Sequence, residues 1–292
     1  MTMSSIRPRF SVVIPCYNEE RFITKTLLSL KHQTFSGNYE IIVVDNNCSD
    51  ETVNIARKFS AVIVTENNPG VCWARQAGTE MAKGEIIVST DADTVHSSDW
   101  LESIDQSFKR HSDCVAVAGP CTYLDGPWWG KKYTKLLFGS VSIVDKLIGF
   151  PFYVTATNIA FKKSAWTGYH TSMTQGGDEL ALLHDLKSEG KVVFNNSNPV
   201  FTSGRRLNKG LLYNIFVSFL LYYLMAYYVN KLFKRRVIGT APAYRTFKPA
   251  NKYRVLAYES AIAAIALIFI HLPGHDTLLQ QAFETLKKVN FF

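Results

Sequence analysis

Short apolar runs alternate with stretches of helical spacing from Phe10 to about Phe201. The apolar runs read FSVVIP, YEIIVVD, AVIVTE and EIIVST, and each is rich in β-branched residues. The stretches between them are roughly 10 to 15 residues long and carry their apolar residues on one helical face. Unbroken apolar strands separated by helices are typical of a parallel sheet with helices on both faces. The pattern therefore predicts a Rossmann-like α/β domain that binds ligands at the carboxyl ends of its strands.

The chain changes character beyond Gly204. Residues 211–230 read LLYNIFVSFLLYYLMAYYVN, which is 20 residues without a formal charge and long enough to cross a bilayer core as a helix. A second apolar segment, at about 256–272, is shorter. We expect an α/β domain over residues 1–204 and a hydrophobic, membrane-associated helical region over residues 205–292. The alternative for the first segment is a helix buried in the protein core.

The net charge of +8 is distributed unevenly along the chain. Residues 1–203 carry 19 Lys and Arg against 21 Asp and Glu, whereas residues 204–292 carry 13 against 3. The excess of positive over negative charge is confined to the last third of the chain, which disfavours a nucleic-acid-binding core. It favours contact between the C-terminal region and anionic lipid headgroups.

The sequence leaves the membrane topology open. The N-terminus lacks the apolar stretch of a secretory signal, and the five cysteines form no C-x-x-C pair, so we expect the α/β domain on the cytoplasmic side. Residues 231–254 contain eight Lys and Arg and no acid, which the positive-inside rule also places in the cytoplasm. One spanning helix cannot have both its ends on the same side. Either this linker lies outside, or the first apolar segment is a hairpin or an in-plane element.

Four clusters of polar residues follow the predicted strands. They read PCYNEE, DNNCSDET, NNPGVCWARQAG and STDADT, the last of which contains Asp91 and Asp93. Each cluster alone can be explained as turn chemistry. Because the ends of parallel strands meet at one edge of a sheet, four such clusters together indicate a binding site. No G-x-G-x-x-G follows the first strand, so a dinucleotide site has little support.

The order of these clusters resembles the inverting family-2 glycosyltransferases, whose nucleotide-sugar-binding domain has the GT-A fold. The resemblance covers approximately Phe10 to Phe201. It implies that Asp45 contacts the nucleotide base, although Asn46 replaces a second acid that the family often has, which leaves uracil or guanine open. It also implies that Gly78 belongs to a segment under the sugar-nucleotide. The further residues implied to bind the nucleotide-sugar are Pro15, Tyr17, Asn18, Glu19, Arg75, Asp91 and Ala92.

Asp91 and Asp93 match the D-x-D metal motif of this family. A nucleotide diphosphate would bring concentrated negative charge to the two carboxylates, which alone would repel it. A divalent cation such as Mg²⁺ or Mn²⁺, bound between the carboxylates and the diphosphate, would stabilise the leaving diphosphate. We therefore expect Asp91 and Asp93 to bind the metal.

Asp178 and Glu179 precede an amphipathic helix that ends at Gly190, where the family has its acceptor side. Inverting transfer needs a base that takes a proton from the acceptor hydroxyl. The family usually has the pair in the order Glu-Asp, so the reversed order leaves open which of the two is the base. Alternatively, both acids stabilise the start of a helix. If the acceptor is an ionised lipid phosphate, the pair can serve to position it.

Arg205 and Arg206 stand immediately before the long apolar run. Guanidinium groups bind phosphates through paired hydrogen bonds, so these residues are candidates for contacting the donor diphosphate or a lipid phosphate. The alternative is a basic flank beside a membrane. The Q-x-x-R-W block of processive polysaccharide synthases is absent from the sequence, which favours transfer of a single sugar.

We expect a membrane-associated glycosyltransferase that moves one sugar, with inversion, from a UDP- or GDP-sugar to an acceptor. The apolar, basic C-terminal region favours a lipid-linked acceptor such as a polyprenyl phosphate or diphosphate, and a glycan acceptor stays open. We expect the protein to contact membrane lipids and not to bind nucleic acid. The sequence leaves the formation of a homo-oligomer open. One alternative is a sugar nucleotidyltransferase, which would need a Gly-rich basic loop where PCYNEERF is acidic. Another is a catalytically silent membrane scaffold that keeps the fold.

Overall fold

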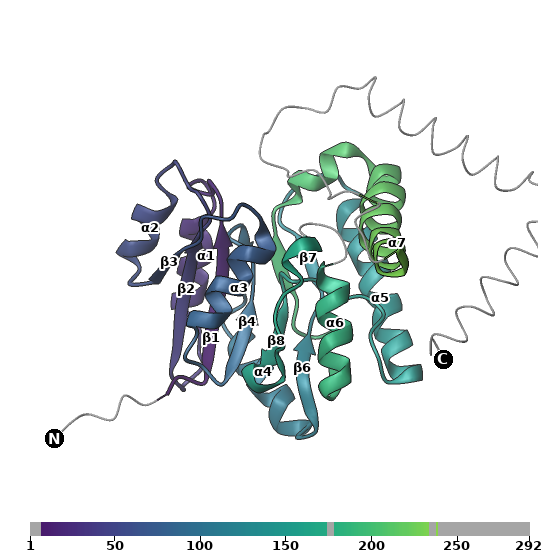
Figure 1. Ribbon diagram of the computed structural model, residues 1–292, viewed down its shortest axis with the longest axis horizontal. Helices are drawn as coiled ribbons and strands as arrows, with labels where there is room; N and C mark the ends of the chain where they lie inside the picture. The colour runs from purple at the N-terminus through teal and green to yellow at the C-terminus, as the bar shows by residue number, and fades with distance from the viewer. Residues whose placement is uncertain (1–6, 174–177, 234–237, 239–292) are drawn as a thin grey trace, which may run out of the picture.

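The computed structural model describes residues 7–173, 178–233 and 238. Its centre is a seven-stranded sheet in the order β3-β2-β1-β4-β8-β6-β9 (Figure 1). Strand β8 runs antiparallel to both of its neighbours, and the other strands are parallel to one another. The prediction of a mostly parallel sheet is confirmed. The strands are β1 (Phe10–Cys16), β2 (Tyr39–Asp45), β3 (Val62–Thr65), β4 (Ile86–Ser89), β6 (Cys114–Ala118), β8 (Ile159–Lys162) and β9 (Lys191–Phe194).

Helices cover both faces of this sheet, as expected from strands that are apolar on both sides. The α-helices are α1 (Ile23–Lys31), α2 (Thr52–Lys58), α3 (Val71–Met81), α4 (Trp100–Arg110), α5 (Gly130–Ile148), α6 (Asp178–Glu189) and α7 (Ala226–Phe233). Three short 3₁₀ helices are η1 (Lys163–Ala165), η2 (Thr171–Met173) and η3 (Gly204–Lys209). The longer η4 (Tyr213–Met225) is a π-helix. Successive side chains of a strand point to opposite faces. Val12 and Ile14 of β1 therefore pack with residues of α1, α2 and α4, while Val13 packs with residues of α3, α5 and α6.

A second, three-stranded sheet lies beside the first and is made of β5 (Thr94–Val95), β7 (Cys121–Tyr123) and β10 (Val200–Thr202). Strand β10 pairs with β5 in antiparallel and with β7 in parallel orientation. Since β5 directly follows the D-x-D segment, this pairing brings the chain near residue 202 next to Asp93. The small sheet therefore places η3, with its two arginines, close to the carboxyl end of β4.

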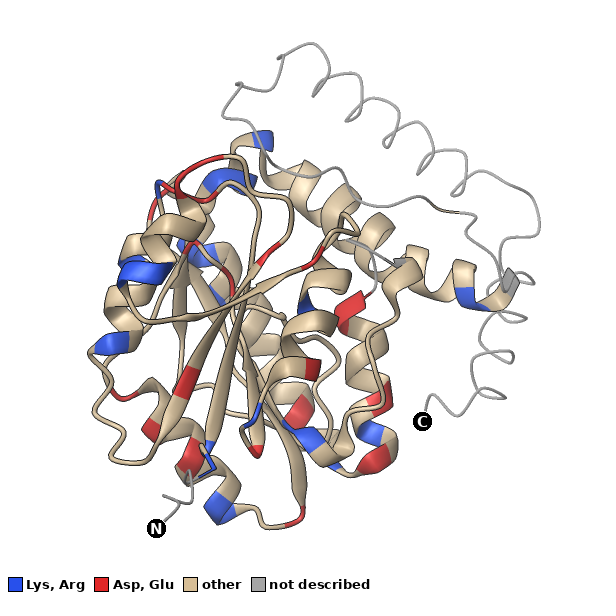
Figure 2. Cartoon of the chain, turned by 60° about the vertical axis from the view of Figure 1, so that its left-hand side comes forward, with Lys and Arg blue, Asp and Glu red and all other residues tan. Residues whose placement is uncertain are grey.

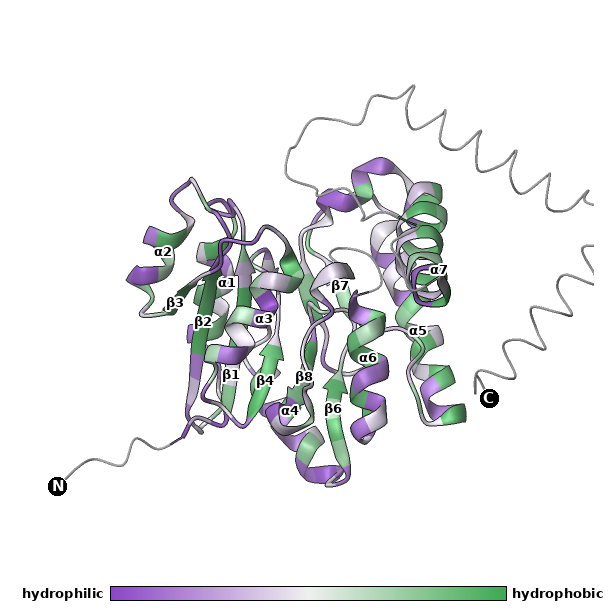
Figure 3. Cartoon of the chain, viewed as in Figure 1, coloured by the Kyte–Doolittle hydropathy of each residue, from purple (hydrophilic) through white to green (hydrophobic). Residues whose placement is uncertain are grey.

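The apolar run predicted at residues 211–230 forms η4 and α7. Tyr213–Leu232 is the one helix among the described residues that is long and apolar enough to cross a membrane. Figure 2 shows it almost without Lys, Arg, Asp or Glu, and Figure 3 shows it as largely hydrophobic. Two of its residues, Tyr223 and Tyr227, pack into the core on the α6 face of the sheet. Length and composition alone give weak support for a span.

The second apolar segment expected at 256–272 and most of the basic linker lie outside the described residues. The boundary expected at residue 204 stays a prediction.

Candidate active site

A cavity of about 310 Å³ opens at the carboxyl end of the central sheet. Its walls come from the segments after β1, β4 and β10, from α3 and α5, and from the start of α6 and the helix η4. Most of the predicted site residues line it together, although they lie far apart in the sequence. They are Pro15, Tyr17, Glu19, Arg75, Asp91, Ala92, Asp93, Asp178, Glu179, Arg205 and Arg206.

Asp91 is held by two side chains that favour its charged form. Nη2 of Arg75 lies 3.0 Å from Oδ1 of Asp91, and the hydroxyl of Thr157 donates to Oδ2 at 2.6 Å. Burial works against the charge of this carboxyl group. The Arg75 guanidinium and the Thr157 hydroxyl outweigh it, so the pKa of Asp91 is lowered. Asp91 is therefore a carboxylate at neutral pH.

Asp93 pairs with Arg205, whereas Asp91 pairs with Arg75. Its Oδ2 lies 2.9 Å from Nη2 of Arg205, and its Oδ1 accepts a hydrogen bond from Thr202 at 3.1 Å. Arg205 also donates to both carboxylate oxygens of Glu19, at 2.7 and 3.0 Å. Burial nevertheless raises the pKa of Asp93, because it outweighs the attraction of Arg205. The negative charge of Asp93 is thus only partly compensated by its protein neighbours.

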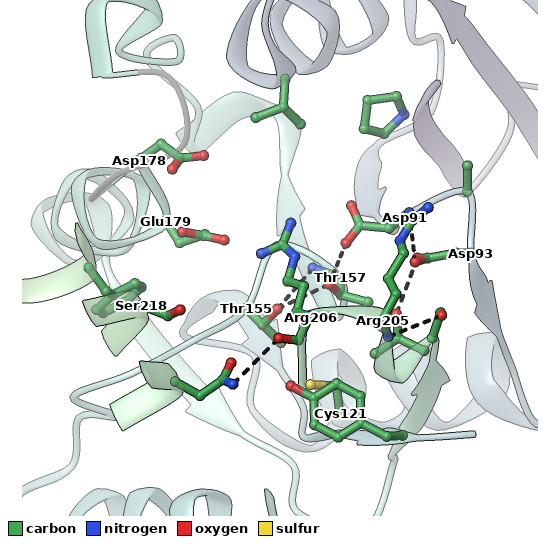
Figure 4. Close-up of a pocket in the computed structure, with 18 of the residues that line it drawn as sticks. Asp91, Asp93, Cys121, Thr155, Thr157, Asp178, Glu179, Arg205, Arg206 and Ser218 are labelled. Carbon is green, nitrogen blue, oxygen red and sulfur yellow. Dashed lines mark hydrogen bonds and ion pairs between the residues drawn. The ribbon is translucent and has the colours of Figure 1, made fainter. Parts of the chain in front are cut away.

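The two acids at the start of α6 have different environments (Figure 4). Oδ2 of Asp178 lies 3.3 Å from Nη1 of Arg75 and accepts from the thiol of Cys72 at 3.4 Å. The carboxyl group of Glu179 has no hydrogen bond or ion pair to another residue of the described chain. Burial, followed by repulsion from Asp178, raises its pKa to about 8. Arg75 therefore joins the Asp91 side of the cavity to Asp178 and leaves Glu179 facing the open space.

Arg206 points into the cavity between Glu179 and Asp91 (Figure 4). Its pKa is raised: burial acts to lower it, but the negative charges of Asp91 and Asp93 outweigh that effect. Both arginines that follow β10 therefore present positive charge to the same space as the D-x-D carboxylates. A diphosphate bound beside these carboxylates would need positive charge at the positions of the two arginines.

Two predicted residues, Asn18 and Asp45, are not among the described residues that line the cavity. Oδ1 of Asp45 accepts a hydrogen bond from the backbone N–H of Cys48 at 2.8 Å. The side chain of Asn18 accepts one from the N–H of Ser49 at 2.7 Å. Both side chains thus brace the turn that follows β2, next to the cavity. Their predicted contact with the nucleotide stays a prediction.

Gly78 and Asn46 have structural partners that the sequence did not reveal. A Cβ atom on Gly78 would lie 2.5 Å from Val13 and 2.7 Å from Val44, so this glycine lets α3 pack closely against β1 and β2. It is not among the described residues that line the cavity. Asn46 donates to the carbonyls of Glu66 and Asn68 and accepts from the N–H of Gly70, which fixes the loop before α3. Asn46, which stands where the family often has a second acid, therefore has a structural role in this loop.

One wall of the cavity was not anticipated from the sequence. It is built from aromatic rings on α5, on η4 and on the loop between α5 and β8. The ring of Tyr153 lies 5.6 Å from that of Phe138, 5.4 Å from that of Phe219 and 4.6 Å from that of Tyr223, measured between centroids. Sequence reasoning also missed Thr157, the hydroxyl donor to Asp91. Only tertiary structure brings these segments together.

The donor set of the cavity fits a divalent cation that is shared with a substrate. No group of three His, Cys, Asp or Glu residues suited to a metal occurs within the described ranges. Mg²⁺ sites on phosphate substrates, however, commonly use one or two carboxylates and the phosphate oxygens rather than a cage of protein ligands. Asp91 and Asp93 provide two carboxylates, and the incompletely compensated charge of Asp93 favours a cation there.

The sequence of this chain is similar to those of known glycosyltransferases. The chain is 37% identical over 107 residues to the glycosyltransferase AglE of Haloferax volcanii, which covers 34% of this chain and 35% of that protein. It is 25% identical over 196 residues to a glucosyl-dolichyl phosphate glucuronosyltransferase of the same organism, 61% of each chain. The chain thus aligns with about a third of the first relative and less than two thirds of the second.

Two solved structures have the same fold. The mannosyltransferase PcManGT from Pyrobaculum calidifontis, in complex with GDP-Man and Mn²⁺, superposes with a TM-score of 0.59 at 20% identity and covers 97% of this chain and 81% of that one. S. aureus TarS 1-349 in complex with UDP has a TM-score of 0.55 at 16% identity, with 69% and 63% coverage. The predicted GT-A fold is thereby confirmed. The sequence model described as "Glycosyl transferase family 2" matches residues 11–168. The chain therefore belongs to glycosyl transferase family 2.

Proposed function

We propose that this protein transfers one sugar, with inversion, from a UDP- or GDP-sugar to a lipid-linked acceptor. The observation that carries the proposal is the convergence of two carboxylates, two arginines and a separate acid on one cavity. Asp91 and Asp93 lie on its donor side, and Glu179 lies across from them. Family membership supports the reaction class.

The donor side is suited to a diphosphate. Arg205 and Arg206 present guanidinium groups to it, and these bind phosphate oxygens strongly. Asp91 and Asp93 would hold a divalent cation such as Mg²⁺ or Mn²⁺, which neutralises charge on the leaving diphosphate when bound. The structure of PcManGT with GDP-Man and Mn²⁺ and that of TarS with UDP support a nucleotide-sugar donor.

Glu179 is the better candidate for the base. Asp178 is engaged by Arg75, whereas Glu179 has a pKa of about 8 and faces the cavity. In the proposed reaction the acceptor oxygen forms a bond to the anomeric carbon while the bond from that carbon to the diphosphate oxygen breaks. When the acceptor group is a hydroxyl, as on a lipid-linked sugar, its proton passes to the carboxylate of Glu179. A base with a pKa near the working pH is the most effective for such a transfer. An acceptor phosphate is already ionised near neutral pH and needs no base.

The acceptor side has the character expected for an isoprenoid chain. Phe138, Tyr153, Phe219 and Tyr223 give it an aromatic wall, and apolar walls with few polar groups are typical of sites for apolar ligands. Part of this wall belongs to the helix that is long enough to cross a membrane. The similarity to a glucosyl-dolichyl phosphate glucuronosyltransferase supports a polyprenyl phosphate or diphosphate. We place the catalytic domain on the cytoplasmic side because its five cysteines are all free thiols, as is usual in a reducing compartment.

A donor screen tests the proposal. The full chain is incubated with individual UDP- and GDP-sugars, polyprenyl phosphate and Mg²⁺ or Mn²⁺, and nucleotide release is measured. We expect metal-dependent release with one donor and a loss of about 10²-fold or more in Asp93→Asn. Asp99→Asn, the same change at an exposed position outside the cavity, is the matched control. Absence of release from every donor, or full activity in Asp93→Asn, would refute the proposal, and binding of nucleotide without turnover would instead favour a silent scaffold.

A further inference from the structure

Helix α5 has apolar residues on two opposite faces. Phe138 and Val141 are buried in the core of the domain. Leu136, Ile143 and Leu147, which follow one another at intervals of seven and four residues, form a line on the other side of the helix. Their exposed fractions are 77%, 61% and 78%. We call these three residues the α5 stripe.

Lysines lie along one side of the α5 stripe. Lys132, Lys135 and Lys146 are exposed on the same helix. Asp145, the one acid of this helix, lies on the face opposite the stripe. Trp128, 79% exposed, precedes the helix, and the ammonium group of Lys132 lies 5.4 Å from the centre of its ring. An apolar line with flanking lysines and an exposed tryptophan is typical of a helix that lies in a membrane interface.

The position of α5 relates the stripe to the cavity. Tyr133, Leu137 and Phe138 of the same helix line the cavity, so the stripe is on the outer side of a cavity wall. The helix η4, which belongs to the candidate membrane helix, contributes to the same aromatic wall of the cavity, and both helices lie on the same flank of the molecule (Figure 1). A bilayer in contact with both helices would therefore lie beside the cavity.

We propose that the α5 stripe inserts into the interface of a bilayer that contains anionic lipids. Lysines beside the stripe attract anionic headgroups, and this attraction falls off within a Debye length of the membrane surface. Two other occupants are electrostatically unfavourable. The linker at residues 234–254 carries seven Lys and Arg and no acid, and it would bring like charge to these lysines. Residues 255–286 carry three acids and no Lys or Arg, so coverage of the stripe by that segment is an outcome of the test below. A second copy related by two-fold symmetry would place the same lysines against each other.

Spin labels test the insertion without requiring catalysis, so a failure here is distinguishable from a failure of the proposed function. Nitroxides are attached at Ile143→Cys or Leu147→Cys, with Cys48 and Cys121, the two cysteines that are not fully buried, changed to Ser. Lys58→Cys on α2, an exposed position, is the control. The full chain is placed in nanodiscs with phosphatidylglycerol. Collision rates are then measured with oxygen, which concentrates in lipid, and with a water-soluble nickel complex.

We expect the labels at residues 143 and 147 to collide with oxygen at least about threefold more often, relative to nickel, than the label at residue 58. This preference should weaken in discs of phosphatidylcholine alone and in the Lys132→Gln, Lys135→Gln, Lys146→Gln variant. Equal nickel access at all three positions would overturn the proposal, because the stripe would then face water. Shielding from both reagents, or dipolar broadening between labels, would also overturn it, because another protein segment or a second copy would then cover the stripe.

Discussion

At the scale of single residues, the cavity depends on one buried arginine. Arg75 is 4% exposed, and its guanidinium group contacts Asp91 with one nitrogen and Asp178 with another. The single positive charge of Arg75 thus bridges two carboxylates and offsets the repulsion between them. Removal of that charge would leave both buried acids without the ion pair to Arg75, a situation that is strongly destabilising.

We therefore expect Arg75→Met to lower the free energy of unfolding by about 3–5 kcal/mol. Arg75→Lys should be intermediate, because a single ammonium group cannot bind both carboxylates in the fork geometry of a guanidinium. Urea unfolding of the variants gives the measurement. Lys58→Met, a charge removal on the exposed side of α2, should change the free energy by no more than about 0.5 kcal/mol. Equal losses in Arg75→Met and Lys58→Met would contradict the bridging role.

Glu179 leads to a prediction about pH. Its pKa is raised to about 8 by burial and by Asp178, so below that pH the group is mostly protonated and cannot accept a proton. We expect kcat/KM to rise as the pH increases through about 8 and then to level off. Glu179→Gln should lower kcat by about 10² to 10⁴-fold and remove this rise. Glu189→Gln, the same change at the exposed end of α6, should do neither, and a pH profile shared by all three proteins would exclude Glu179 as the base.

Site residues that directly follow a strand could be predicted from the sequence pattern, whereas Arg75, Asp178 and Glu179, which lie on helices, were indicated by the family resemblance. Asp91 and Asp93 come directly after an apolar strand, and the edge of a parallel sheet brings such residues together. Thr157 could not be predicted, because its contact with Asp91 spans 66 residues and leaves no local pattern. The order of Asp178 and Glu179 did not identify the base either. Only the structure distinguishes the acid that Arg75 engages from the acid that it leaves facing the cavity.

At the scale of elements, the close packing of α3 on the sheet depends on a missing side chain. A Cβ atom at Gly78 would approach Val13 and Val44 to 2.5 and 2.7 Å. We expect Gly78→Ala to destabilise the protein by about 1–3 kcal/mol, since the helix would have to move away from the strands. The measurement is the midpoint of urea unfolding.

Gly139 in α5 is the matched control. A Cβ atom there would meet nothing within 4 Å, so Gly139→Ala should stabilise the helix by about 0.5–1 kcal/mol. The opposite signs of these two changes separate the effect of packing from the effect of helix propensity. Stabilisation by Gly78→Ala would contradict the packing described for α3.

The elements themselves were largely predictable. The apolar runs at FSVVIP, YEIIVVD and EIIVST became β1, β2 and β4, because β-branched residues in a continuous run suit a strand covered on both faces. The reversed direction of β8 was not predictable, since an apolar run carries no information on strand direction. The aromatic wall was also missed, because α5 and η4 meet only through the tertiary fold.

At the scale of the whole molecule, the cavity crosses the boundary expected at residue 204. Arg205 and Arg206 lie just beyond it, and so does η4, which provides one wall. Tyr223 and Tyr227 belong to the hydrophobic core of the α/β domain. The fold and the cavity therefore require residues that the sequence pattern assigned to a membrane region.

A pair of truncations tests this dependence. We expect residues 1–204 alone to bind UDP or GDP at least about tenfold more weakly than residues 1–238, because hydrogen bonds to charged groups contribute roughly 1.5–3 kcal/mol each. Isothermal titration calorimetry with both nucleotides provides the measurement, and circular dichroism shows whether each truncated chain is folded. Equal affinity of two folded chains would mean that the region beyond residue 204 contributes nothing to donor binding.

The central claim is that the cavity holds the donor diphosphate on the side of Asp91 and Asp93 and the attacking group on the side of Glu179. Attack from the side opposite the leaving group must invert the anomeric carbon. The most direct measurement is the anomeric configuration of the product, determined by NMR after reaction of the full chain with the donor identified in the screen. An α-linked nucleotide-sugar is expected to give a β-linked product. An α-linked product would contradict the account, because it would require attack from the side that the diphosphate occupies.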